Sequence, residues 1–220
     1  MQQTEQQDKG VRSWTRILLF FGVSLLFFVM ADRAMAARQV QLGIADKVIR
    51  FHVLADSDSK EDQELKLKVR DTVGLMMKER LEGAQNLDQS RQIIQDSLGD
   101  IENCARAVIL REGYTYGVEA SLTDSSFPVK TYGRAFFPAG EYEALRVVIG
   151  SGKGHNWWCV MYPNLCFAGS MYEVDEDRSR QQLREVLSPE EYETVMEGEG
   201  YQVRFRFLTF LDKIFSGGSR

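Results

Sequence analysis

The sequence predicts an α+β fold. We expect a single domain in which a mixed or mostly antiparallel sheet packs against two long helices, with extra helices at the C-terminal end. Three observations predict it: a strand pattern comes first, two long helical patterns follow, and a run of strand patterns comes after them. Strands that are grouped, rather than alternating one by one with helices, are typical of α+β domains.

Composition agrees with one folded domain plus tails. The chain has 220 residues, of which 44% are hydrophobic and 27% are charged. A chain of this length can bury a core without structural metals. Its formal net charge of −5 gives no electrostatic reason to bind nucleic acid or anionic lipid, so we expect no nucleic-acid partner.

The first strand pattern is KVIRFHVLA, Lys47–Ala55. It is rich in β-branched and aromatic residues, and Ile49, Phe51 and Val53 share one face. Such a pattern predicts a central strand that is covered on both faces.

The first helix follows the stretch DSDS, residues 56–59. Ser59 with Asp62 three residues later is a capping-box pattern. Apolar residues then recur at helical spacing: Leu65, Val69, Val73 and Met76. The charged residues between them are expected to point mostly to solvent: Lys66, Lys68, Arg70 and Asp71.

The remaining elements follow from the same periodicities. A second long helix is expected over Asp88–Arg111, and strands are expected at Tyr114–Leu122, Thr131–Phe137 and Tyr142–Ile149. TDSSFP, residues 123–128, is expected to be a turn. Further helices are expected to start in residues 173–182 and at Ser188, while Tyr201–Phe215 fits a helix or a strand, with a helix favoured.

Residues 1–36 are typical of a secretory signal peptide or an N-terminal membrane anchor. Basic residues precede an apolar run over Ile17–Ala31, and Ala34–Ala36 fits an A-x-A cleavage site. As a helix this run would measure about 22 Å, shorter than the ~30 Å hydrocarbon core, which favours the signal peptide. The alternatives are an anchor that extends to Met35, with Trp14 among the headgroups, and a buried core helix.

In both main interpretations the rest of the chain is exported. Membrane contact is then expected only through the N-terminal segment, if it stays uncleaved. The rest of the chain divides into a linker over 37–46, an α+β domain over 47–170 and a helical C-terminal extension over 171–220.

Export also affects the three cysteines, because disulfides persist outside the cytoplasm. Pro163-Asn164 is a turn signal between Cys159 and Cys166, and a hairpin there could bring the two within disulfide distance. We therefore expect a Cys159–Cys166 disulfide and a free, partly buried thiol at Cys104.

The stretch GSGKGHNWWCVMYPNLCF, residues 150–167, raises several possible chemistries. No Ser or Thr follows Lys153 and no helix pattern follows the glycines, so a phosphate loop is disfavoured and a turn between strands is expected. A catalytic pair of Cys159 and His155 lacks an obvious third group to orient it. His52 and Asp56 could ligate a metal, but a capping turn with solvated acids is favoured, so we expect no metal and no cofactor.

Two adjacent tryptophans follow the glycines. In a strand, Trp157 and Trp158 face opposite ways, so one can join the core. We expect the other to be exposed beside His155 and Asn156, as in hot spots of protein–protein recognition.

Two segments resemble a known family. IRFHVLADSDSKEDQELKLKVRD (Ile49–Asp71) resembles the opening segment of the stage II sporulation protein R family. PAGEYEALRVVIGSGKGHNWWCVMYPNLCF (Pro138–Phe167) resembles its second signature, and the likeness covers residues 47–168.

The resemblance implies a signalling protein of endospore formation. Such a protein is made in the forespore and exported into the space between the forespore and mother-cell membranes. Its implied partner is a membrane-embedded aspartic protease, which it triggers to remove the pro-sequence of an early mother-cell sigma factor.

We therefore expect a protein without catalytic residues that binds its partner through the two signature segments. The candidate partner-binding residues are His52, Asp56, Asp58, His155, Asn156, Trp157 and Trp158. The alternative is an exported hydrolase that acts on cell-wall material with His52 and Asp56 in its site. A binding protein would signal without turnover, whereas the hydrolase would lose activity on conservative changes at those two residues.

Overall fold

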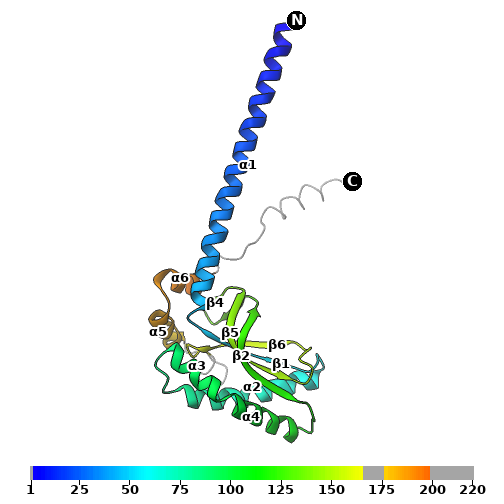
Figure 1. Ribbon diagram of the computed structural model, residues 1–220, viewed down its shortest axis with the longest axis vertical. Helices are drawn as coiled ribbons and strands as arrows, with labels where there is room; N and C mark the ends of the chain where they lie inside the picture. Colours follow the sequence, from blue (N-terminus) through cyan, green and yellow to red (C-terminus); the bar gives the residue numbers. More distant parts are fainter. Residues whose placement is uncertain (1, 166–175, 199–220) are drawn as a thin grey trace. The chain divides into compact units, whose positions relative to one another are not determined.

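The structure is a computed structural model that describes residues 2–165 and 176–198 (Figure 1). The chain divides into two compact units, Met1–Gly43 and Ile44–Arg220, and each is described by itself. Cys166 and the segment Tyr201–Phe215 lie outside the described residues.

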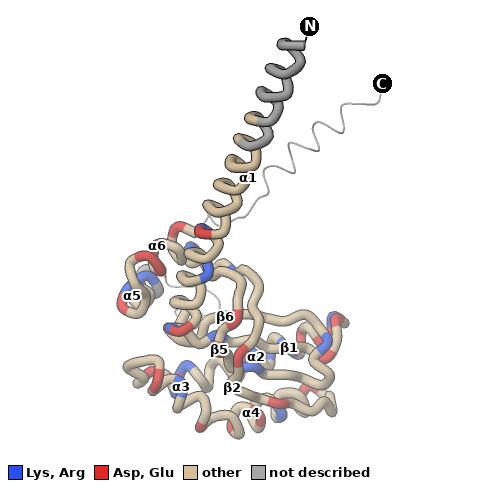
Figure 2. The backbone as a smooth tube through the Cα atoms, turned by 45° about the horizontal axis from the view of Figure 1, so that its top comes forward, with Lys and Arg blue, Asp and Glu red and all other residues tan. Residues whose placement is uncertain are grey.

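The first unit consists of helix α1, Gln2–Ala45, whose last two residues belong to the second unit. Its large apolar side chains from Leu18 to Met30 are exposed, and Figure 2 shows no charged residue along this tan stretch. The helix from Leu18 to Ala45 is long and apolar enough to cross a membrane. Its 28 residues measure about 42 Å, more than the ~30 Å hydrocarbon core. Such a helix suggests a signal sequence or an anchor.

Residues 37–45 are helical, where the sequence led us to expect a linker. They contain strong helix formers such as Ala, Arg, Gln and Leu, and no proline interrupts them. Ile44, at the end of this helix, is fully buried in the second unit.

The second unit is built on a four-stranded mixed sheet with the strand order β2-β5-β1-β6. Its strands are β1 (Ile49–Leu54), β2 (Val118–Phe127), β5 (Gly140–Ile149) and β6 (Asn156–Tyr162). β1 runs parallel to β5 and antiparallel to β6, and β2 runs antiparallel to β5. Two short strands, β3 (Lys130–Tyr132) and β4 (Ala135–Phe137), form a separate hairpin. The α+β fold is confirmed.

Three helices cover one face of this sheet: α2 (Lys60–Leu81), α3 (Leu87–Asp96) and α4 (Leu98–Arg111), as Figure 1 shows. The apolar stripe of α2 packs there against the inward face of β1, which carries Ile49, Phe51 and Val53. The opposite face of β1 carries Arg50 and His52, which are also buried. β1 is therefore covered on both faces, as predicted.

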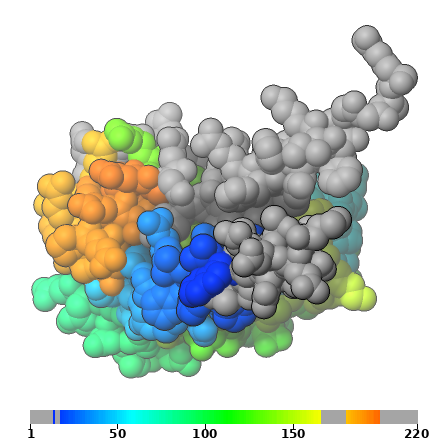
Figure 3. Space-filling model, turned by 90° about the horizontal axis from the view of Figure 1, so that it is seen from above, coloured from blue at the N-terminus to red at the C-terminus, as the bar shows by residue number. Residues whose placement is uncertain are grey.

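Two shorter helices follow, α5 (Glu176–Val186) and α6 (Pro189–Glu197), and they lie together at one end of the domain (Figure 3). α6 begins with a capping box in which the Ser188 hydroxyl accepts the Glu191 amide and the Glu191 carboxylate accepts the Ser188 amide. The same carboxylate binds the Lys47 ammonium at 2.6 Å, so α6 is tied to the segment before β1. The helix start predicted at Ser188 is confirmed.

Three predicted element boundaries are wrong. The second long helix breaks at Ser97, whose hydroxyl accepts a hydrogen bond from Arg80, and becomes α3 and α4. Residues 123–127 are not a turn but the second half of β2, because they pair with β5 from Ala144 to Gly140. Tertiary pairing thus overrides a local turn propensity. The strand predicted over 131–137 folds back at Gly133, which has a φ of 55°, to give β3 and β4.

Candidate functional site

The two signature segments meet at one edge of the sheet. β1 and β5 are parallel, so their carboxyl ends lie side by side, and β6 begins at the same edge. The acidic turn (Asp56–Ser59) leads from β1 to α2, and the glycine turn (Gly150–His155) leads from β5 to β6. These two turns, more than 90 residues apart in the sequence, are in direct contact.

Hydrogen bonds lock the glycine turn onto the acidic turn. The Ser151 amide donates to Asp56 Oδ1 at 2.6 Å, and the Ser151 hydroxyl donates to the Asp56 carbonyl at 2.9 Å. The Lys153 amide also donates to the Asp56 carbonyl, and the Gly154 amide donates to the Ala55 carbonyl. Because these amides already bind protein oxygens, they are not available to cradle a phosphate.

The close approach of the turns depends on glycine at two positions. Gly150 has a φ of 58°, and a Cβ there would lie 2.2 Å from Asp56 Oδ1. A Cβ on Gly154 would lie 2.2 Å from the carbonyl oxygen of Ser57. A side chain at Gly154 would push the turns apart, because it would meet backbone atoms, and one at Gly150 would displace the Asp56 side chain that holds the glycine turn.

Asp58 and His155 form the exposed part of the two turns. Asp58 Oδ1 accepts from the His155 amide at 2.6 Å and lies 2.5 Å from His155 Nδ1. The backbone hydrogen bond from His155, and then its side-chain contact, lower the pKa of Asp58. The two side chains remain 56% and 80% exposed. A partner can therefore reach this fixed pair, and half-buried Asn156 follows it in the chain.

Two side chains of helix α2 support the glycine turn and the start of β6. Lys66 is only 5% exposed, and its ammonium donates to the His155 carbonyl at 2.9 Å and to the Gln63 side chain. Arg70, one turn further along, is buried, and its guanidinium carbon lies 4.9 Å from the centre of the Trp157 ring. The expectation that both cations point to solvent is wrong, because each has a partner on β6 or the glycine turn.

The two tryptophans face opposite sides of the sheet, as expected for consecutive strand residues. Trp157 packs on the helix side, where its ring lies 5.5 Å from that of Phe51. Trp158 lies on the other side, stacked on His52 at 5.0 Å and 11°, with Phe127 at 4.6 Å. Both side chains are half-buried, so neither is the fully exposed ring that we expected.

His52 lies beneath Trp158 and is 4% exposed. Its two ring nitrogens are buried without a hydrogen-bond partner. Burial, followed by the nearby Arg146 and Arg50, lowers the pKa of His52 to about 4. His52 is therefore a neutral support for Trp158 rather than a surface residue, and it makes no hydrogen bond to Asp56.

Arg50 is a buried cation without a carboxylate partner among the described residues. Its guanidinium carbon lies 4.4 Å from the ring centre of Phe127 and within 6 Å of three further rings: Tyr132, Phe137 and Tyr142. Arg50 Nε donates to the Cys159 carbonyl at 3.0 Å. It thereby holds the β3–β4 hairpin against the face of the sheet that lies opposite the helices.

The cysteines are only partly described. Cys159 is disulfide-bonded, and Cys104 on α4 carries a free, half-buried thiol whose pKa is raised by burial. The pairing of Cys159 with Cys166 remains a prediction, because Cys166 lies outside the described residues.

Sequence reasoning missed three supporting residues of the site: Arg50, Lys66 and Arg70. A signal for two of them was present, because Asp62, Lys66 and Arg70 are spaced four residues apart. They form a polar row directly beside the apolar row of α2, and all three are buried. The face of α2 that packs against the sheet is thus wider than its apolar residues alone indicate.

Comparison with known proteins agrees with the two signature segments. The family model of stage II sporulation protein R matches residues 45–172, which include both turns. The chain is 30% identical over 214 residues to the stage II sporulation protein R of Bacillus subtilis (strain 168), which covers 91% of this chain and 96% of that protein. No solved structure matches. The chain therefore belongs to the stage II sporulation protein R family.

Proposed function

We propose that the protein is the secreted signal that activates a membrane-embedded aspartic protease during endospore formation. It is exported from the forespore into the space between the forespore and mother-cell membranes. The activated protease then processes the precursor of an early mother-cell sigma factor. The protein acts in this scheme by binding its partner, without turnover.

The observation that carries the proposal is the fixed, exposed edge formed by the two turns. Asp58 and His155 are exposed, but hydrogen bonds to backbone groups hold them in place, including the bond from the Lys66 ammonium to the His155 carbonyl. The two glycines at which the turns approach each other closely also fix their position. A preformed polar surface of this kind loses little conformational freedom when it binds. It lies within the segment that matches the family, whose name supports a role in sporulation.

The contacts of His52 and Asp56 favour binding over the hydrolase alternative. A general acid or base must be within hydrogen-bond reach of its substrate. His52 is buried and lies under Trp158, whereas the Asp56 carboxylate accepts the Ser151 amide within the turn. The two side chains face different surroundings and are not arranged as an acid–base pair.

Reconstitution of the reaction tests the proposal. The protease and the sigma-factor precursor are co-expressed in membranes of a host that does not sporulate, with and without the full chain. We expect processing only when the chain is present, with a rate that saturates near one chain per protease and stops after its removal. Equal processing without the chain would contradict the proposal, and activation by trace amounts would favour an enzyme.

A further inference from the structure

Four residues form one row across the sheet on the face opposite the helices, which we call the outer face. Arg146 on β5 lies opposite Ser121 on β2 and pairs with His52 on β1. His52 in turn lies opposite Trp158 on β6. Paired residues share a face of the sheet and neighbouring strands are about 4.8 Å apart, so Arg146 lies directly between the Ser121 hydroxyl and the stacked rings of His52 and Trp158.

Arg146 is a cation without an anion. Its side chain is half-buried and makes no hydrogen bond or ion pair within the part of the chain that the structure describes. Glu119 is the acidic residue nearest to it on the outer face, one row closer to the two turns, and no ion pair joins them. A half-buried guanidinium has lost part of its water, which strengthens its attraction to a carboxylate that reaches it from outside.

The buried polar groups beside Arg146 also lack partners. His52 is 4% exposed, and neither of its ring nitrogens has a hydrogen bond. Arg50, two residues before it on the same face, is fully buried and its Nη1 has no acceptor. Burial, followed by Arg146 and Arg50, lowers the pKa of His52. Two cations thus lie near one unpaired histidine, and no carboxylate of the described residues pairs with either of them. Uncompensated charge of this kind costs stability, and a docked anion would reduce the cost.

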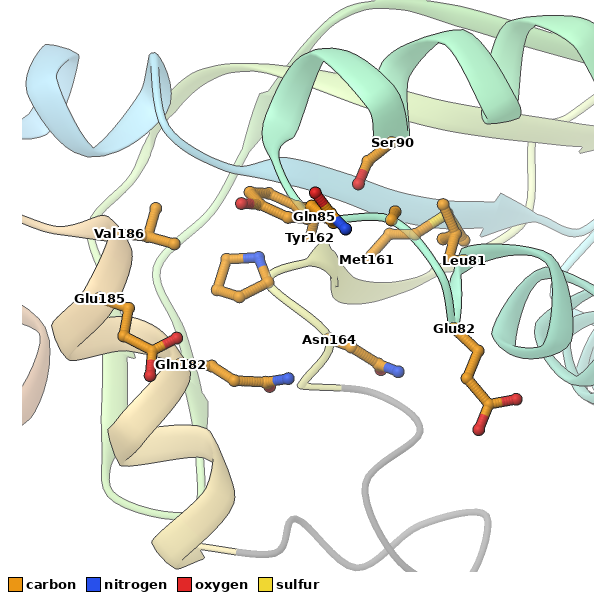
Figure 4. A pocket seen from close by; sticks show the side chains of 12 residues that line it. Leu81, Glu82, Gln85, Ser90, Met161, Tyr162, Asn164, Gln182, Glu185 and Val186 are labelled. Carbon is orange, nitrogen blue, oxygen red and sulfur yellow. The ribbon is translucent and has the colours of Figure 1, made fainter.

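The cavity at the other end of β6 is not an alternative place for an anion (Figure 4). Glu82 and Glu185 lie in its wall, and none of its twelve lining residues is Lys, Arg or His. Burial first, and then the charge of Glu185, raise the pKa of Tyr162 there. An acidic side chain would be repelled from that end of β6 and attracted to the row that contains Arg146.

The outer face is continuous with the surface of the two turns. Asn156 lies on the same face of β6 as Trp158, two residues before it, and follows His155 in the chain. Trp158 is half-buried, so part of its ring is open to a partner and offers apolar surface beside a polar row. A partner that covers His155 and Asn156 would therefore reach the row of Arg146 as well.

We propose that the outer face binds an acidic side chain, Asp or Glu, presented by the protein partner that the two turns recognise. The carboxylate accepts hydrogen bonds from the Arg146 guanidinium and from the Ser121 hydroxyl. The apolar part of the same partner segment packs on the Trp158 ring. The inference rests on the proposed function for the identity of the partner, and it adds the chemistry by which that partner is recognised.

Peptide binding to the full chain in detergent micelles tests the inference. The probe is a capped Ala-Glu-Ala tripeptide, and the neutral comparison is capped Ala-Gln-Ala. NMR signals of the His52 ring and the Trp158 indole report on the row. We expect the glutamate peptide to shift both signals saturably and the glutamine peptide to bind about tenfold more weakly. Equal binding by the two peptides would overturn the inference. Equal binding by inorganic phosphate would also overturn it, because the row would then be a site for small anions.

Arg146→Gln is the critical variant, and Arg106→Gln on α4 is its matched control. Both changes remove one positive charge, but Arg106 is exposed on the helix layer that covers the other face. Arg146→Gln should weaken glutamate-peptide binding about fivefold, the size of a partly exposed ion pair, whereas Arg106→Gln should not change it. The inference is wrong if the two variants have equal effects.

Two further measurements separate binding from folding. The urea unfolding midpoint of Arg146→Gln should not fall below the parent value, because the substitution also removes a cation that lies near Arg50. Arg146→Lys keeps the charge and should bind the glutamate peptide more tightly than Arg146→Gln does; equal binding by these two variants would contradict a role for the charge. The binding measurement uses this chain alone, so its failure is separate from failure of the reconstitution.

Discussion

At the residue scale, Gly154 shows how closely the acidic and glycine turns approach each other. Its backbone passes so near Ser57 that even a methyl group has no room, whereas Gly83, Gly99, Gly113 and Gly117 face open space. The requirement for glycine here comes from a neighbour almost 100 residues away in the sequence, so local turn propensity alone does not reveal it.

Replacing Gly154 with Ala should therefore destabilise the protein by about 1–3 kcal/mol, because one turn must move to accommodate the new Cβ. Gly99→Ala is the matched control, since Gly99 lies in α4 with nothing within 4 Å of the added atom. The control should leave stability unchanged or raise it by up to about 1 kcal/mol. Urea unfolding measures both variants, and equal effects would contradict the close approach.

Burial of His52 predicts a pH dependence of stability. Its pKa of about 4 in the folded protein lies below the ordinary histidine pKa of 6.5, so the unfolded chain binds a proton that the folded chain rejects. The stabilisation that comes from keeping His52 neutral is fully present above pH 6.5. It is lost as the pH falls toward 4. Linkage gives a loss of about 2.5 kcal/mol in unfolding free energy between pH 7.5 and 4.5.

Urea unfolding of His52→Leu and His155→Gln at those two pH values checks this. The His52 variant should show a pH dependence smaller by that amount, because its titrating group is gone. The larger change in pH dependence should belong to the His52 variant, because His52 is buried whereas the His155 side chain is 80% exposed. The assignment is wrong if the His155 variant, and not the His52 variant, loses the dependence.

At the scale of elements, α2 both covers the sheet and supports the site. Its apolar row packs on β1, and the neighbouring polar row brings Lys66 under the glycine turn and Arg70 against Trp157. The tryptophans are likewise part of the packing on each side of the sheet. Trp157→Ala and Trp158→Ala would therefore disturb folding as well as recognition. These variants cannot distinguish a loss of stability from a loss of partner binding.

Lys66→Met keeps the aliphatic stem of the side chain and removes its ammonium donor. We expect a loss of about 1 kcal/mol in unfolding free energy, since the His155 carbonyl loses a charged donor. Amide hydrogen exchange in the glycine turn should become faster in the same variant. Lys60→Met is the control, because Lys60 is 83% exposed and lies 3.7 Å from Glu64; it should change stability by less than about 0.5 kcal/mol. If Lys66→Met and Lys60→Met have the same unfolding free energy and the same exchange rates in the glycine turn, Lys66 does not support the turn.

Elements with strong periodicity were predictable from the sequence. β1, α2 and the capped start of α6 follow from apolar spacing and cap residues, and the structure places them as expected. The second half of β2 and the break at Ser97 were not predictable, because pairing with β5 and a contact from Arg80 decide them. Local sequence does not contain those long-range contacts.

The candidate site was predictable as two segments but not as one surface. Asp58 and His155 were singled out from their motifs, yet their contact depends on the parallel pairing of β1 with β5. Lys66 was assigned to solvent because it is charged, and His52 was a candidate for partner binding because it lies in a signature segment. Burial reverses both assignments, and burial depends on what the fold places over a residue.

At the scale of the whole molecule, the chain divides into the N-terminal helix and the α+β domain. If a signal peptidase cuts after Ala36, the exported protein should begin at Ala37. The cut would remove the exposed apolar residues from Leu18 to Met35 and leave Ile44 and Val48 in the core of the domain, so thermal stability of the domain should not change. Mass spectrometry of protein from a secreting host reads the N-terminus directly. An intact N-terminus on membrane-bound material would show that α1 is an anchor.

The central claim is that the edge formed by the two turns is the surface through which the chain activates its partner protease. The most direct measurement is the rate of sigma-factor precursor processing in reconstituted membranes, with Asn156→Ala and His155→Ala compared against the exposed control Glu193→Ala. We expect each turn variant to activate processing about 30-fold more slowly, the loss of a ~2 kcal/mol hot spot, and the control to support processing at the parent rate. Urea unfolding midpoints should stay at the parent value for all three variants. Parent-level processing by a folded double variant of Asn156 and His155 would contradict the account.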